Sequence, residues 1–378
     1  MFILIKNAHV YNPCDLGVKQ ILVACGKVVE IADQIDVAYH GLKIIDAKGK
    51  IVLPGIIDKH IHITGGGGEA GFKSKVPEIR LSQLLKSGIT SVVGLLGTDS
   101  VSRSVESLLA KTKGLREEGI NAYCLTGAYS YPSPTITGSV KKDIALISEV
   151  IGTKIALSDH RDSAVSADEL ARLALDTRVG GMMGDKKSFL TIHMGNSASR
   201  LNKIYKVMEE NDINIKMFQV THVGRNKELF YDCIDFNKKG GYIDISADGN
   251  FTDIVEIFKI LKDKNADFDL ITLTSDGNGS WSLYDDNNNL ITIGAASCDL
   301  VLKKVVKLIK NNVLSYEEAF KLATLNVAKS IGINAGEIKN GINADMIMLD
   351  ENLELDMVMI NGRVFLEDKQ IVIKGMFE

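Results

Sequence analysis

The stretch LPGIIDKHIHI, residues 53–63, decides the fold of this chain, because it joins a core strand to two potential metal ligands. Its apolar residues form a short run next to a Pro-Gly pair, which is typical of a strand buried on both faces. His60 and His62 end the run, and side chains two positions apart on a strand point to the same side. We therefore expect a buried strand that presents two imidazoles together.

Seven further apolar runs follow along the chain. They are ITSVVGLLG (89–97), NAYCLTG (121–127), GTKIALSD (152–159), LTIHMG (190–195), KMFQVTHVG (216–224), GYIDISAD (241–248) and DLITLTSDG (269–277). The stretches between them, such as 100–119 and 166–181, carry apolar residues at helical spacing. Strand–helix alternation repeated eight times predicts an α/β protein with a (β/α)8 TIM-like barrel over residues 53–335, close to the roughly 250 residues typical of that fold. An open doubly wound sheet is the alternative.

The two ends of the chain have a different pattern. Residues 1–52 and 336–378 contain short β-rich runs separated by turn residues at close spacing. Such runs predict a small β-sandwich domain built from both chain termini. The sequence DDNNN at residues 285–289 predicts a polar turn inside the barrel region.

Composition excludes several classes of function. The chain has 378 residues, 45% of them hydrophobic, and a formal net charge of −4, so we expect no nucleic-acid partner and no anionic membrane partner. Its apolar runs fall short of the roughly 20 residues that a membrane span needs, and the N-terminus lacks a signal-peptide pattern. The five cysteines are scattered and odd in number, which indicates free thiols and a cytoplasmic location.

Polar residues that bind metals fall at the ends of the apolar runs. They are His60 and His62 in the first run, His193 in the fifth, His222 in the sixth and Asp276 in the eighth. A single strand-end histidine is usually a hydrogen-bonded structural residue, but four of the seven histidines share this placement. Because the carboxyl ends of barrel strands meet on one face, the set predicts a site for zinc or a similar divalent ion.

Lys154 lies inside the fourth run, between apolar neighbours. An unpaired ammonium is costly to bury, and burial favours the neutral amine. A neutral amine can add carbon dioxide to become a carbamate, an anion whose two oxygens can bridge two cations. The alternative is a lysine paired with a nearby carboxylate.

The glycine run at residues 65–68 must be compared with nucleotide-binding turns. Gly66, Gly68 and Gly71 match GxGxxG after a strand, but no acidic residue follows about 20 positions on, as the dinucleotide motif requires. There is also no GK[ST] of a P-loop. Glycine also permits close backbone approach to a ligand, which would let Glu69 meet a substrate ammonium.

Several stretches together indicate a family. The sequence PGIIDKHIH, followed in order by a lysine, two single histidines and an aspartate, resembles the amidohydrolase superfamily, as does GEIKNGINADMIMLD (336–350). More narrowly, the chain resembles the isoaspartyl dipeptidase family in HIHITGGGGEAG, GTD, TGAYSYPSPTITGSVKKDI, KIALSDHRDS, THVGRN and LTSDGNGS. This resemblance covers essentially the whole chain.

The resemblance implies a metal site and a substrate. Two zinc ions would be held by His60, His62, Lys154, His193, His222 and Asp276, with Lys154 carboxylated and bridging. The substrate would be a β-aspartyl dipeptide, cleaved by a hydroxide that bridges the two ions, with Asp276 and Tyr129 as catalytic residues. Substrate contacts would come from Gly67, Glu69, Thr98, Tyr129, Arg161, Arg225 and Ser280. A homo-oligomer is also implied.

Two other functions remain open on the sequence. A cyclic-amide hydrolase or an N-acyl amino-acid deacylase would use the same scaffold and metals, but its substrate would lack the free ammonium that Glu69 suits. A non-catalytic binding protein of the same fold is less favoured, because this chain keeps every implied metal ligand.

Overall fold

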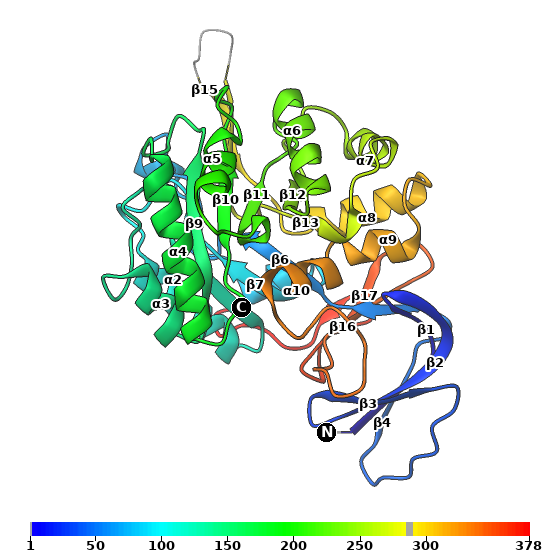
Figure 1. Ribbon diagram of the computed structural model, residues 1–378. Helices are drawn as coiled ribbons and strands as arrows, with labels where there is room; N and C mark the ends of the chain where they lie inside the picture. The colour runs from blue at the N-terminus through cyan, green and yellow to red at the C-terminus, as the bar shows by residue number, and fades with distance from the viewer. Residues whose placement is uncertain (1, 285–289) are drawn as a thin grey trace.

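The computed structural model describes residues 2–284 and 290–378, and its centre is a barrel of eight parallel strands (Figure 1). The strands are β6 (Ile56–Ile61), β7 (Ile89–Gly94), β8 (Asn121–Gly127), β9 (Val150–Leu157), β10 (Leu190–Met194), β11 (Phe218–Thr221), β12 (Tyr242–Ser246) and β13 (Ile271–Thr274). Neighbouring strands pair in chain order, and the first and last strands meet where the amide of His62 donates to the carbonyl of Gly277 at 2.9 Å. The predicted TIM-like barrel is confirmed.

Helices cover the outside of the barrel (Figure 1). They are α1 (Leu81–Leu85), α2 (Val105–Glu117), α3 (Val140–Leu146), α4 (Ala167–Met183), α5 (Asn202–Glu210), α6 (Lys227–Lys238), α7 (Ile254–Asp263), α8 (Leu300–Lys310) and α9 (Tyr316–Lys321). Two of them begin at N-cap side chains where Ser104 accepts from the amide of Ser107 and Ser166 from that of Glu169. Among the described residues, no helix has both the length and the apolar character to cross a membrane.

One further helix closes one end of the barrel. α10 (Leu325–Ile331) packs Val327 and Ile331 into an apolar cluster with residues near the amino-terminal ends of the strands. Examples are Ile57 in β6 and Phe189, which directly precedes β10. The side-chain Nδ2 of Asn326 donates to the carbonyl of Ile271, where β13 begins. Because this end is filled by apolar side chains, only the opposite end, at the carboxyl termini of the strands, is left for a site.

Both termini form a second, mixed sheet of nine strands. Its strands are β1 (Phe2–Asn12), β2 (Cys14–Ala24), β3 (Lys27–Ala32), β4 (Lys43–Asp46), β5 (Ile51–Pro54), β16 (Met346–Leu349), β17 (Leu355–Ile360), β18 (Arg363–Glu367) and β19 (Gln370–Ile371). The two halves join where β5 pairs with β16, and apolar side chains from both halves form a hydrophobic core of their own. The expected joint domain is therefore present as a sheet, whereas its boundaries at residues 52 and 336 stay a prediction.

A hairpin stands on the open side of the barrel. It consists of β14 (Ser280–Tyr284) and β15 (Leu290–Ala295), and the polar turn predicted for residues 285–289 lies outside the described residues. Trp281 is 50% exposed on β14. Its ring lies over Gly294 of β15, where an added Cβ would come within 2.4 Å of the indole.

Candidate active site

The residues predicted to bind metal all lie toward the carboxyl ends of barrel strands. His60 is on β6, Lys154 on β9 and His193 on β10. His62 and His222 directly follow β6 and β11, and Asp276 is the second residue after β13. All but Asp276 are buried. The barrel therefore brings together side chains that are far apart along the sequence.

Three of these residues form a compact group. His60, His62 and Asp276 each offer one ligand atom, and these atoms lie within 4.8 Å of one another. Asp276 Oδ1 is 3.2 Å from His62 Nε2 and 3.5 Å from His60 Nε2. This is the arrangement of a candidate metal site.

The other two histidines lie beside this group. The ring centroids of His222 and His60 are 4.9 Å apart, and those of His222 and His193 are 4.5 Å apart. Each of the two rings has one nitrogen fixed by a hydroxyl group: His222 Nδ1 is 2.6 Å from Ser246 Oγ, and His193 Nδ1 is 2.6 Å from Tyr129 Oη. Such partners orient an imidazole. In His222 the other nitrogen, Nε2, is left without a partner, whereas His193 Nε2 lies 3.0 Å from Asp159 Oδ2.

Lys154 reaches the same place from β9. Its side chain is fully buried, and its Nζ lies 3.1 Å from His60 Nε2. Burial lowers the pKa of this amine to about 7, against the opposing effect of Asp276 and Asp244. A substantial share of the amine is therefore neutral near pH 7, the form that carboxylation requires.

The donor set fits divalent cations. The pKa values of His60, His193 and His222 are lowered well below the usual value by burial, so the imidazoles are neutral and able to ligate. His60 Nδ1, His62 Nδ1, His222 Nε2 and Asp276 Oδ1 are buried without a hydrogen-bond partner. Buried polar atoms normally have partners. Asp276 Oδ1 faces Nε2 of His60 and of His62, and His222 Nε2 is the nitrogen left free by Ser246, so these two unsatisfied atoms favour an ion as the missing partner.

The backbone is strained at two of these ligands. His222 and Asp276 have φ angles of 60° and 52°, in the left-handed region that side chains rarely adopt. Each such residue costs on the order of 1–3 kcal/mol and is typical of functional sites. His222 follows the last residue of β11, and Asp276 comes two residues after the end of β13, so the left-handed turn redirects their side chains as the chain leaves the barrel.

A buried carboxylate that sequence reasoning missed joins two of the ligand-bearing segments. Asp58 accepts a hydrogen bond from the His60 amide at 3.1 Å and from both the amide and the hydroxyl of Ser275, which precedes Asp276. Burial raises the pKa of Asp58 to about 7. Its position two residues before His60, on the same side of the strand, was the available signal.

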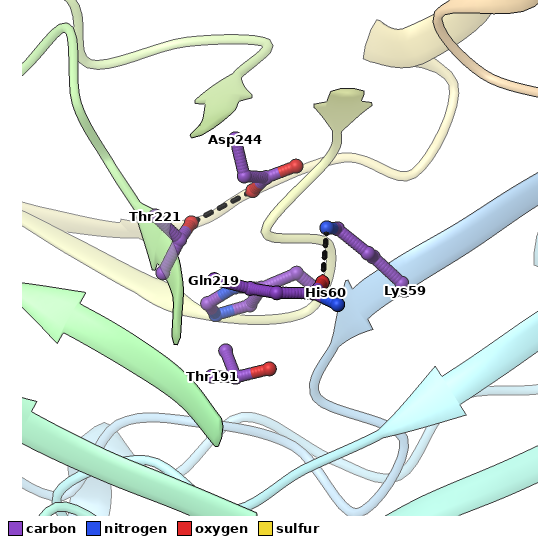
Figure 2. A pocket seen from close by; sticks show the side chains of 6 residues that line it. All are labelled: Lys59, His60, Thr191, Gln219, Thr221 and Asp244. Carbon is purple, nitrogen blue, oxygen red and sulfur yellow. Dashed lines mark hydrogen bonds between the residues drawn. The ribbon is translucent and has the colours of Figure 1, made fainter. Parts of the chain in front are cut away.

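Below the ligands the barrel interior is polar (Figure 2). In this view Lys59 donates to Gln219 at 2.6 Å, and Thr221 donates to Asp244 at 2.7 Å. Asp244 also accepts hydrogen bonds from Thr272 and Thr274. This layer separates the ligand set from the apolar cluster around α10, and its buried charges have partners.

Three of the residues predicted to bind substrate contact a fourth, Glu69. Its carboxylate accepts from Thr98 Oγ1 at 3.2 Å, from Ser280 Oγ at 3.0 Å and from Arg161 Nη1 at 3.4 Å. These partners follow β7, β13 and β9, so three strand ends supply them. The cluster places the Glu69 carboxylate beside the Arg161 guanidinium group, whose Nη2 lies 3.3 Å from His193 Nε2.

Arg161 and Arg225 converge on a carboxylate that the sequence analysis assigned no role. Asp159 Oδ1 accepts from Arg161 Nε at 2.8 Å, and Oδ2 lies 3.1 Å from Arg225 Nη1 and 3.0 Å from His193 Nε2. Burial opposes ionisation of Asp159, but hydrogen bonds from His193 and Arg161 outweigh it and hold its pKa well below the usual range. Asp159 therefore fixes both guanidinium groups beside His193.

The glycine run approaches protein backbone closely, while its predicted approach to a ligand stays a prediction. A Cβ on Gly65 would lie 1.9 Å from the carbonyl oxygen of Val76, and one on Gly67 would lie 2.2 Å from that of Ser74. A Cβ on Gly66 would lie 2.9 Å from Cα of Gly279. Glycine is required because the loop folds tightly on itself and against the segment before Ser280.

The barrel, the terminal sheet and the ligand cluster together define a class of protein. The model of the amidohydrolase family matches residues 51–365, and the chain belongs to this family. It is 36% identical to β-aspartyl dipeptidase of Fervidobacterium islandicum AW-1, solved in complex with β-Asp-Leu dipeptide, with a TM-score of 0.93 over 98% of both chains. The resemblance to this enzyme that the sequence indicated is confirmed.

More distant relatives share the fold. The chain is 24% identical to 5-methylthioadenosine/S-adenosylhomocysteine deaminase of Thermococcus onnurineus over 93% of this chain and 86% of that protein. Dihydropyrimidinase from Brevibacillus agri superposes with a TM-score of 0.71 at 16% identity, over 99% and 97% of the two chains. At such identities the likeness extends to the architecture alone.

Proposed function

We propose that this amidohydrolase is a dipeptidase that hydrolyses β-aspartyl dipeptides. The observation that carries the proposal is the cluster around Glu69, where Thr98, Ser280 and Arg161 surround one carboxylate beside the metal-ligand set. The 36% identity to a β-aspartyl dipeptidase over the full chain supports the same substrate class.

The charges of the site match those of such a substrate. A β-aspartyl dipeptide has one ammonium and two carboxylates. Glu69, with Thr98 and the loop backbone at Gly67, would receive the ammonium, while Arg161, Arg225 and Ser280 would hold the carboxylates. Asp159 occupies only part of the donors of each guanidinium group, and arginine forks suit carboxylates.

We infer that the site holds two zinc ions, with His60, His62 and Asp276 on one, His193 and His222 on the other, and carboxylated Lys154 between them. Two such ions would lower the pKa of a shared water and polarise the scissile carbonyl. The neutral state of the imidazoles and the lowered pKa of Lys154 support this assignment.

The protein's own groups would then move the protons. Asp276 is 30% exposed at its side chain, so its carboxylate can take the proton of the attacking water and return it to the departing amine. The Tyr129 hydroxyl would donate to the oxyanion of the tetrahedral intermediate. Burial raises the pKa of Tyr129 well above its usual value, which keeps the phenol protonated for that purpose.

The decisive experiment compares β-Asp-Leu with its α-linked isomer, using the zinc-loaded protein. We expect hydrolysis of the β-linked peptide and little or none of the α-linked one. Equal rates, or a preference for the α-isomer, would reject the proposal. Hydantoin, dihydroorotate and N-acyl amino acids test the alternatives on the same scaffold, and a 5′-modified adenosine tests the deaminase activity of the distant relatives.

A further inference from the structure

The loop that carries Glu69 is a narrow hairpin. The amide of Val76 donates to the carbonyl of Gly66 at 2.9 Å, and Gly67 pairs with Lys75 in an antiparallel bridge. Its tip has local bonds, including the amide of Ala70 to Ser74 Oγ at 3.1 Å. Glu69 therefore sits at the end of a stiff arm, and its position depends on how the base of the arm is held.

One side chain holds both sides of that base. Arg103 lies between β7 and α2, and its side chain is 10% exposed. Its Nε donates to the carbonyl of Thr64 at 2.9 Å, at the beginning of the loop. Its Nη2 donates to the carbonyl of Val76 at 2.7 Å, at the end of the loop. A guanidinium group suits this task because its donors lie in a rigid plane.

The third nitrogen of the Arg103 guanidinium group contacts Asp99, the residue after Thr98. Arg103 Nη1 donates to Asp99 Oδ2 at 3.0 Å. Asp99 also accepts from the amide of Ser102 at 2.8 Å, and Lys75 Nζ donates to Ser102 Oγ at 2.7 Å. The same network thus fixes the segment that bears Thr98 relative to the hairpin that bears Glu69.

We propose that Arg103 is a positioning residue for recognition of the substrate ammonium. It touches neither the metal ligands nor the groups around Glu69, and it acts by holding Glu69 and Thr98 in one relative position. The inference rests on the proposed function and deepens it. It predicts a specific loss: ligands with a free amino group are affected, and those without one are not.

The test is calorimetric binding of L-aspartate and N-acetyl-L-aspartate to the zinc-loaded protein. Because a misplacement of about 1 Å can cost on the order of 10²-fold, Arg103→Gln should weaken L-aspartate binding about 10- to 100-fold. Binding of N-acetyl-L-aspartate, which has no ammonium, should be unchanged. Arg103→Lys keeps the charge without the fork and should give an intermediate loss, with its fold checked by thermal unfolding.

Two further variants separate positioning from general stabilisation. Arg116 lies near the carboxyl end of α2, and its guanidinium group donates to the carbonyl of Ala122. Arg116→Gln should leave the affinities for L-aspartate and N-acetyl-L-aspartate unchanged. Glu69→Gln combined with Arg103→Gln should bind L-aspartate no more weakly than Glu69→Gln alone, because both changes affect one interaction.

The outcomes are distinct. Equal weakening toward both ligands, no weakening by Arg103→Gln, or additive losses in the double variant would overturn the role of Arg103 while leaving the proposed function intact. A wild-type protein that hydrolyses no β-aspartyl dipeptide would reject the proposed function, and the role of Arg103 with it.

Discussion

The hydroxyl of Tyr129 lies 2.6 Å from Nδ1 of His193, so the side chain proposed to contact the scissile carbonyl also contacts a proposed metal ligand. The guanidinium carbon of Arg161 lies 5.2 Å from the centre of the same phenol ring. One tyrosine therefore connects three parts of the site: a ligand, a carboxylate-binding arginine and the place where the peptide bond is expected.

Tyr129→Phe should lower kcat for β-Asp-Leu by about 10²–10³-fold, the usual cost of one lost oxyanion donor. Thermal stability should stay close to wild type because the ring and its packing remain, whereas zinc affinity should fall, since the hydroxyl also contacts Nδ1 of His193. Steady-state kinetics and metal analysis check both points. Tyr123→Phe, on β8 just before Tyr129, is the control, since its ring packs against Arg116. Near-full activity of Tyr129→Phe would contradict the role.

Lys154→Ala should lose both zinc and activity, because the proposed bridging carbamate could no longer form. Added formate or acetate should restore part of each by occupying the space of the missing group. Metal analysis and activity are measured with and without the acid. Lys186→Met is a suitable control, since that amine is satisfied by three backbone carbonyls, of Ile144, Ile147 and Val150. Full activity of Lys154→Ala without added acid would show that no bridge is needed.

Glu69→Gln should raise KM for β-Asp-Leu by roughly 10-fold or more, in line with the about 1.5–3 kcal/mol of a hydrogen bond to a charged group. The reason is that the amide keeps the shape of the side chain but loses the charge that faces the ammonium. Glu78→Gln, which removes a partner of Lys111, serves as the control. Unchanged KM for peptides with a free amino terminus would refute the assignment.

Removal of metal should abolish activity and lower the melting temperature. Buried ligand atoms such as His222 Nε2 and Asp276 Oδ1 would then lose the proposed ion, and a ligand at 100 times its Kd contributes about 2.7 kcal/mol to stability. Calorimetry before and after chelation, followed by addition of zinc, measures the change and its reversal. His160→Asn should behave as wild type, because that side chain is exposed. A chelated protein with unchanged activity would exclude a metal mechanism.

Stability should fall as pH rises from about 4 to about 6 through one carboxyl group in particular. Burial raises the pKa of Asp345 to about 6, above the roughly 3.9 of an unfolded aspartate. As the pH rises, Asp345 therefore ionises in the unfolded chain before it ionises in the folded protein. The free energy of unfolding falls by up to about 3 kcal/mol across this window, and Asp345 causes no further loss above it.

Asp345→Asn should remove that part of the pH dependence. Asp345 accepts from Asn121 Nδ2 at 2.9 Å and from the amide of Asn361 at 2.7 Å, so it connects the barrel to the terminal sheet. Urea unfolding at several pH values, with wild type and variant side by side, gives the difference. Identical pH profiles would mean that Asp345 does not ionise in this range.

Much of the fold was predictable because it depends on local periodicity. The eight apolar runs needed only their spacing and the turn residues between them to indicate barrel strands, and His60, His193 and His222 fell at strand ends where a barrel collects side chains. The joint sheet of the two termini followed from matching composition. The exact pairing, such as that of β5 with β16, depends on contacts between distant residues and has no local signal.

The supporting residues of the site were harder to predict, since their roles arise only when separate loops meet. Asp159 acquires its role because Arg161 and Arg225 arrive from two different strand ends. Arg103 acquires its role because three segments pass within reach of one guanidinium group. The glycine run was interpreted as a loop that approaches a ligand closely, but the sequence did not show that the loop's own backbone is also a close neighbour.

The position of Trp281 makes the protein its own optical reporter. It is the single tryptophan of the chain, it is half exposed, and it directly follows Ser280, whose hydroxyl contacts Glu69. All indole emission therefore originates beside the proposed ammonium site. A spectral change on titration with a dipeptide can be assigned to this corner of the molecule without a label or an engineered probe.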